Sequence, residues 1–142
     1  MGTLMYSDEE SPAWPTYGLD QTIVEAWVRK TFGDKVMDSP LERGLRVVEE
    51  AIEVLQTQCG DQTKGRDLAH RLVDEVFDKP IGKLPQEVGG LGVTILALCA
   101  LHDMRFDTVV RIEIDRVQGA DRDKIRAKQR AKADKGLALR PD

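Results

Sequence analysis

Three glutamates, Glu49, Glu50 and Glu53, lie within five residues of one another. On a helical wheel they share a sector of about 100° with Arg46, and apolar side chains fill about the opposite half. Glu49 and Glu53 are four residues apart, where like charges destabilise a helix by about 0.2–0.5 kcal/mol. A hard cation would remove that repulsion, because carboxylate oxygens are the ligands that Mg²⁺ and Mn²⁺ prefer. The alternative is a solvated polar face on which Arg46 pairs with its acidic neighbours, and this helix alone does not decide between them.

A fourth glutamate, Glu87, opens a long apolar stretch. No Asp, Glu, Lys or Arg lies between Glu87 and Asp103, and the apolar residues cover every side of the wheel, which predicts a buried helix. Gly89, Gly90 and Gly92 weaken this helix, so we expect another backbone or a ligand to approach closely. Glu87 either stabilises the positive end of the helix dipole or faces the glutamate cluster and completes a metal site.

The elements that would position these residues are helices. Only seven aromatic residues are present among 142, which favours a core of Leu, Val, Ile and Ala between helices. Ser39, Pro40 and Glu42 form a clear start signal, with an N-cap, a proline at the first helical position and a capping-box acid. The pattern predicts an all-α bundle of four or five helices, over about residues 21–32, 39–58, 67–77, 85–102 and 108–117.

Composition divides the chain into an arm, a helical domain and a tail. Residues 1–19 lack periodicity and read as an N-terminal arm, which Trp14 and Tyr17 could pin to the body. Residues 20–119 form the expected helical domain. Residues 120–142 form a basic, polar tail, helical or disordered, with residues 121–134 favouring a solvated helix.

The net charge is −4, and it combines an acidic body with a basic tail. An acidic body is not expected of a specific nucleic-acid binder, whereas it suits a cation site that recruits phosphates. Cys59 and Cys99 suggest neither a disulfide framework nor a zinc site. We expect a cytoplasmic protein, because no secretory signal is evident and the uncharged segment 88–101 is shorter than a membrane span.

The run Glu49-Glu50-Ala-Ile-Glu53, followed by Glu87-Val-Gly-Gly90 at the start of an apolar helix, resembles the MazG-like all-α NTP pyrophosphohydrolases. Members of that family carry a Glu-Glu-x-x-Glu helix and then a helix beginning Glu-x-x-Asp. The resemblance covers about residues 20–130. It extends through Trp27, Phe32-Gly33, Glu42-Arg43, Arg46, Gln56, Val76-Phe77, Pro80-Ile-Gly82 and the segment Lys124–Lys128.

This resemblance implies that Glu50, Glu53 and Glu87 are metal ligands, and that Glu49 is a further ligand or the catalytic residue that orients the attacking water. It further implies Mg²⁺-dependent hydrolysis of a nucleoside triphosphate to the monophosphate and pyrophosphate. The second motif has Gly90 where the family has Asp. Asp74, or its neighbour Glu75, is a candidate substitute ligand, or a surface acid.

Arg43, Arg46, Lys79 and Lys83 are candidates for binding the substrate phosphates, or are solvated charges. The family and the wide apolar face of residues 39–58 together predict a homodimer or homotetramer. Since the Asp of the motif is missing, the alternative function is a catalytically weak MazG-like protein that binds a nucleotide or a protein partner.

Overall fold

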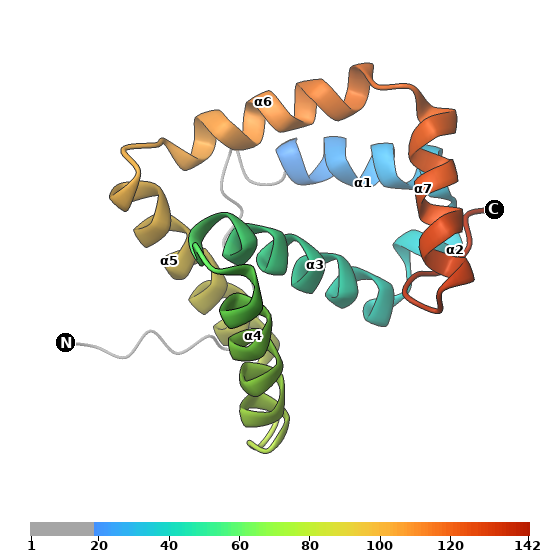
Figure 1. The fold of residues 1–142 in the computed structure, drawn as a ribbon. Coiled ribbons are helices and arrows are strands. Elements are labelled where there is room, and N and C mark those ends of the chain that lie inside the picture. The colour runs from blue at the N-terminus through green and yellow to red at the C-terminus, as the bar shows by residue number, and fades with distance from the viewer. Residues whose placement is uncertain (1–18) are drawn as a thin grey trace. The chain divides into compact units, whose positions relative to one another are not determined.

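The computed structural model describes residues 19–142, and this part of the chain is all-α, as expected, with seven helices and no strand (Figure 1). The helices are α1 (Leu19–Phe32), α2 (Asp34–Met37), α3 (Pro40–Gln58), α4 (Gln62–Phe77), α5 (Leu84–Leu101), α6 (Phe106–Gly119) and α7 (Arg122–Asp134). The predicted N-terminal arm, with Trp14 and Tyr17, lies outside the described residues.

The described residues form two compact units, each made of segments that are distant in sequence. The first contains residues 19–24 and 81–119, and therefore α5 and α6. The second contains residues 25–80 and 120–142, and therefore most of α1 together with α2, α3, α4 and α7. The domain boundaries expected from the sequence stay a prediction.

Side-chain caps and glycines determine where the helices of the second unit begin and end. Ser39 Oγ accepts a hydrogen bond from the Glu42 backbone N–H (3.2 Å), which confirms the predicted N-cap of α3. Asp61 Oδ1 accepts one from the Lys64 N–H (3.1 Å), so α4 begins at Gln62, earlier than the predicted start near residue 67. Gly33 and Gly60 follow α1 and α3 with φ of +98° and +67°, which glycine adopts without strain.

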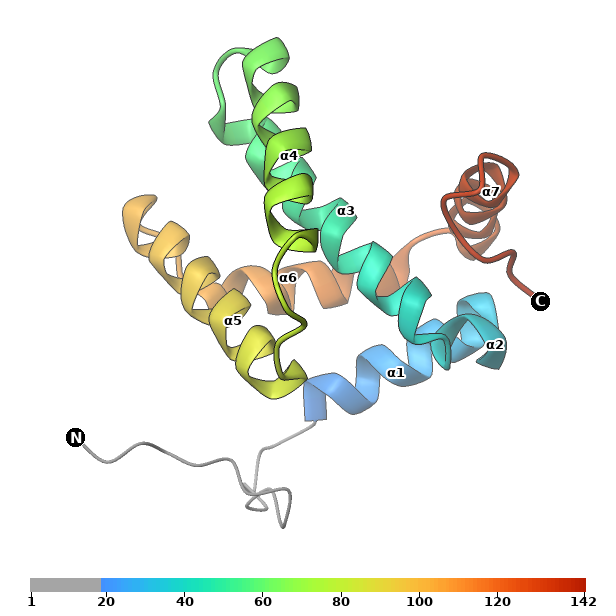
Figure 2. The ribbon, with the colours of Figure 1, turned by 90° about the horizontal axis from the view of Figure 1, so that it is seen from below.

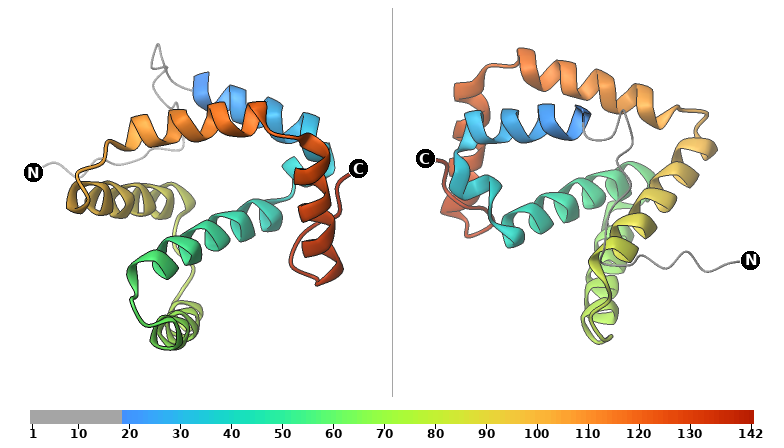
Figure 3. Two further views of the ribbon diagram at one scale, coloured as in Figure 1. Left: turned by 45° about the horizontal axis from the view of Figure 1, so that its top comes forward. Right: turned by 180° about the vertical axis from the view of Figure 1, so that it is seen from behind.

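In the second unit, α7 lies beside α2 and the C-terminal end of α1 (Figures 1 and 3). Val28 and Val36 are buried there, and Arg126 Nη1 donates a hydrogen bond to the Thr31 carbonyl (2.7 Å). The expected helix over residues 121–134 is present, but it is not only a solvated tail. Its Gln129 side chain is 5% exposed, so α7 contributes to the core of this unit.

In the first unit, α5 packs against α6, with Cys99 and Ile114 buried. The expectation that α5 is buried on all sides is wrong for this chain alone, because α6 covers only part of its surface. Of its residues only Cys99 is buried, while Val93 and Leu96 are 69% and 55% exposed. By length and composition α5 could also cross a membrane.

The glycines of α5 do not have a close neighbour in the described chain. A Cβ added at Gly89, Gly90 or Gly92 would meet no atom within 4 Å. The three glycines predicted that another backbone would approach this helix closely. No described segment does so, and the surface beside these glycines is open.

Candidate functional site

The three carboxylates of the glutamate cluster differ in their surroundings on α3. Glu49 is half-buried, whereas Glu50 and Glu53 are exposed. Glu53 makes no hydrogen bond or ion pair with any described residue, while Glu50 does have a polar interaction. Of the three, Glu53 is therefore the carboxylate most available to a ligand.

Glu49 is held by two cations. Its Oε2 accepts a hydrogen bond from Arg46 Nη1 (2.5 Å), and its Oε1 lies 2.6 Å from Lys132 Nζ on α7. Both carboxylate oxygens are therefore engaged within the second unit. The catalytic role expected for Glu49 stays a prediction, and an attacking water would have to compete with these two partners.

A buried carboxylate, Glu42, anchors the start of α3 to the C-terminal segment. It is 1% exposed, and its Oε1 and Oε2 accept hydrogen bonds from Gln129 Nε2 (2.8 Å) and the Leu139 N–H (2.9 Å). Arg46 Nε lies 3.3 Å from Glu42 Oε1. The capping-box role predicted for Glu42 is wrong, because its oxygens accept hydrogen bonds from α7 and from the segment after it.

The candidate phosphate-binding cations are mostly engaged elsewhere. Arg46 Nη2 donates to the Leu137 carbonyl (2.5 Å), in addition to its pairs with Glu42 and Glu49. Arg43 lies 3.9 Å from Glu42, and its burial lowers the pKa of its guanidinium below the usual value.

Lys79 and Lys83 lie in exposed positions outside this network. Lys79 Nζ pairs with Glu75 Oε1 (3.5 Å) on the surface of α4. Lys83 is the N-cap residue of α5 in the first unit, and its side chain has no polar partner among the described residues. The phosphate-binding role expected for these two lysines stays a prediction.

The remaining predicted ligands lie on two other helices. Glu87 is in the first turn of α5, in the first unit, and its carboxylate lies over Gly82, where an added Cβ would be 2.1 Å from Glu87 Oε1. Asp74 is exposed on α4 in the second unit. Among residues 19–142, no three His, Cys, Asp or Glu side chains are gathered in a group that could hold a metal ion.

In the second unit, α3 and α4 form a helix–loop–helix (Figures 1 and 2). A cavity of about 350 Å³ is lined by residues of these two helices and of the loop between them. Its lining is mainly apolar, with a few polar side chains among which Glu53 is the only member of the glutamate cluster. The lining residues are Ile52, Glu53, Leu55, Gln56, Cys59, Gln62, Gly65, Arg66, Ala69, His70 and Val73.

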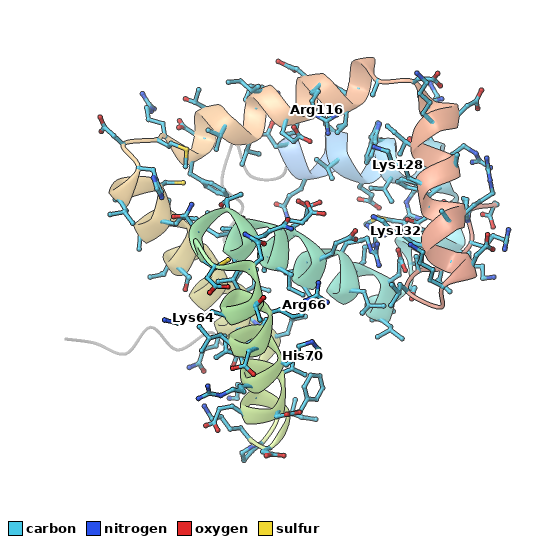
Figure 4. All side chains as sticks on the ribbon, viewed as in Figure 1. Lys64, Arg66, His70, Arg116, Lys128 and Lys132 are labelled. Carbon is cyan, nitrogen blue, oxygen red and sulfur yellow. The ribbon has the colours of Figure 1, made fainter. Side chains whose placement is uncertain are left out.

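Arg66 and His70 are polar residues of this cavity that the sequence did not single out. They are four residues apart on α4, and Figure 4 shows both on the same side of that helix. Helical spacing could have found them once α4 was known to begin at Gln62, because Arg66 and His70 then share a face with Ala69 and Val73.

No protein-family model, curated protein or solved structure matches this chain. The functional assignment therefore depends on the motif resemblance and on the surroundings of the side chains described above.

Proposed function

We propose that the protein is a Mg²⁺-dependent nucleoside triphosphate pyrophosphohydrolase of the MazG-like type, acting in the cytoplasm. The observation that carries the proposal is Glu53. It belongs to the motif, has no polar partner in the described chain, and lines a cavity large enough for a small ligand. A carboxylate without a counter-charge beside an open cavity is a suitable Mg²⁺ ligand.

In the proposed reaction, water attacks a phosphorus atom of the triphosphate, a P–O bond to the leaving pyrophosphate breaks, and the nucleoside monophosphate remains. Mg²⁺ supplies neutralisation of the developing charge when bound. Glu50 and Glu53 would hold it from α3. Asp74 is the candidate substitute for the Asp ligand of the family, at whose position this chain has Gly90.

The direct test is pyrophosphate release from a panel of nucleoside triphosphates, with and without Mg²⁺. We expect Glu53→Gln to reduce the Mg²⁺-dependent release by roughly tenfold to 100-fold, because it removes a ligand charge. Glu113→Gln is the control, since it changes an exposed acid that pairs with Arg116 on α6 and belongs to no predicted site. Equal release by both variants, or no release with any nucleotide, would exclude this function.

The alternative, a catalytically weak nucleotide-binding protein, is favoured by Gly90. A Cβ at this position meets nothing within 4 Å, so Gly90→Asp can restore the family's acid without a clash in the described chain. If the missing acid limits turnover, this variant should raise pyrophosphate release. An increase in Mg²⁺ affinity without any release, measured by calorimetry, would favour the alternative.

The proposal includes a homodimer or homotetramer, and the exposed apolar surface of α5 supports it. Leu84, Val88, Val93, Leu96 and Leu101 are each more than half exposed. Large exposed apolar surface is typical of an interface in a soluble protein. Sedimentation should show an oligomer that Val93→Glu shifts toward the monomer, whereas a monomeric wild-type chain at all concentrations would exclude this part of the proposal.

A further inference from the structure

The cavity between α3 and α4 contains an arginine, a histidine and an amide that the glutamate motif does not include. Arg66 and His70 have no hydrogen bond or ion pair with any described residue. Elsewhere on α4, Arg71 pairs with Asp67 (3.5 Å), and Glu75 pairs with Lys79 just after the end of the helix (3.5 Å). The Lys64 side chain also has no partner, but it does not line the cavity, so Arg66 and His70 are the unpaired basic residues that do.

The joined end of the two helices is packed closely and closes one end of the cavity. Gly65 is buried, and a Cβ added there would lie 2.6 Å from Cys59 Sγ. Gln62 Nε2 donates a hydrogen bond to the Gln56 carbonyl (3.1 Å) across the same loop. These contacts fix α4 against the end of α3, and so they fix the first turns of α4 from which Arg66 extends.

The walls and the polar groups suit different parts of one ligand. Ile52 and Leu55 on α3, with Ala69 and Val73 on α4, provide apolar surface for a flat ring. The Gln56 side-chain amide has both a donor and an acceptor and no partner in the described chain, so it can bind the edge of a base.

The charged groups of the cavity suit a phosphate chain that carries a metal ion. The Arg66 guanidinium offers paired donors that match phosphate oxygens. Glu53 lies in the same lining and would hold a divalent metal ion, which would neutralise phosphate charge.

We propose that the α3–α4 cavity binds the nucleotide itself. The base lies between the apolar walls beside Gln56, and Arg66 and His70 bind the phosphates. This inference rests on the proposed function for the identity of the ligand. Arg66 and His70 therefore take the phosphate-binding role first predicted for Arg43 and Arg46. The guanidinium groups of Arg43 and Arg46 are engaged by Glu42, Glu49 and the Leu137 carbonyl.

The test compares Arg66→Gln with Lys64→Gln in the full chain. Both variants remove one positive charge from the N-terminal half of α4, but Lys64 extends from the opposite side of the helix and does not line the cavity (Figure 4). Calorimetry with ATP, GTP, CTP and UTP in EDTA measures binding without metal or turnover. Arg66→Gln should weaken binding of the preferred nucleotide about tenfold, because a charged hydrogen bond is lost, and Lys64→Gln should leave it within about twofold.

Two partial ligands separate the phosphate contact from the ring contact. Arg66→Gln should weaken the binding of inorganic tripolyphosphate and leave that of the free nucleoside unchanged. Ala69→Trp, which fills the cavity, should abolish nucleoside binding, and circular dichroism checks that this variant is folded.

Equal effects of Arg66→Gln and Lys64→Gln would overturn the inference, as would nucleotide binding that Ala69→Trp leaves intact in a folded protein. The inference and the proposed function can fail separately. Mg²⁺-dependent pyrophosphate release that Arg66→Gln does not change would leave the enzyme standing and exclude this cavity. Nucleotide binding that depends on Arg66 without any release would retain the cavity and exclude the enzyme.

Discussion

Glu42 offers the most direct test of how the second unit is held together. Its carboxylate is 1% exposed and accepts hydrogen bonds from Gln129 Nε2 and the Leu139 N–H. Both donors come from sequence positions more than 80 residues later. Replacing Glu42 by Gln keeps the shape of the side chain, but it turns one acceptor oxygen into an amide that faces a donor.

The magnitude follows from these contacts. Loss of one hydrogen bond to a buried charged group costs about 1.5–3 kcal/mol. Arg43 and Arg46 also lose their buried counter-charge, but their side chains are 31% and 21% exposed and partly solvated. We therefore allow no more than about 1 kcal/mol for this second effect. Glu42→Gln should lower the free energy of unfolding by about 3 kcal/mol, which lowers the melting temperature by roughly 10 °C.

Urea denaturation followed by circular dichroism measures this change, with Glu53→Gln as the matched control. Glu53 is also on α3, but it is exposed and has no polar partner in the described chain, so its variant should stay within about 0.5 kcal/mol of the wild type. If Glu42→Gln is as stable as Glu53→Gln, the contacts of Glu42 do not stabilise this unit, and the account of its packing given above is wrong.

Two further predictions concern backbone packing and pH. Gly65→Ala places a Cβ 2.6 Å from Cys59 Sγ and should lower the free energy of unfolding by about 1–3 kcal/mol. Gly44→Ala meets nothing within 4 Å and should raise that free energy by about 0.5–1 kcal/mol, because alanine favours a helix more than glycine does. Urea denaturation that gives both changes the same sign would contradict this prediction. The hydrogen bond from Arg29 holds the pKa of Asp38 below its ordinary value of 3.8, so its contribution to stability is present above that value and is lost as pH falls further. Thermal unfolding from about pH 6 to about pH 2.5 should therefore show a steeper acid loss in the wild type than in Arg29→Gln, and parallel curves would refute the assignment.

Local signals in the sequence predicted most of the helices, but not all of their limits. The Ser39 cap and Pro40 fixed the first residue of α3, because capping involves only neighbouring residues. The start of α4 was missed because its cap, Asp61, lies in a polar stretch that resembles a loop. The four-residue helix α2 was missed because it is too short to show a periodic pattern.

Contacts between distant segments could not be predicted in the same way. The burial of Gln129 depends on Glu42, 87 residues earlier, and no local pattern marks a glutamine in a basic helix as part of the core. Arg46 was equally ambiguous. Its pairing with acidic neighbours on its own helix was one of the two alternatives, and Glu42 and Glu49 confirm it. Its hydrogen bond to the Leu137 carbonyl, from the segment after α7, appears only in the tertiary structure.

These contacts divide the charged residues of α3 between two roles. Glu42, Arg46 and Glu49 form a network with the C-terminal segment, and it occupies groups that the motif alone assigns to chemistry. Glu53, two turns beyond Arg46, is free of this network and lines the cavity. A metal ion bound by the glutamate cluster would therefore lie at Glu53, on the side of the cavity and Arg66, and not on the side of Arg46. Lys132→Gln should therefore lower the free energy of unfolding but change the rate of pyrophosphate release less, because its partner Glu49 belongs to the structural network.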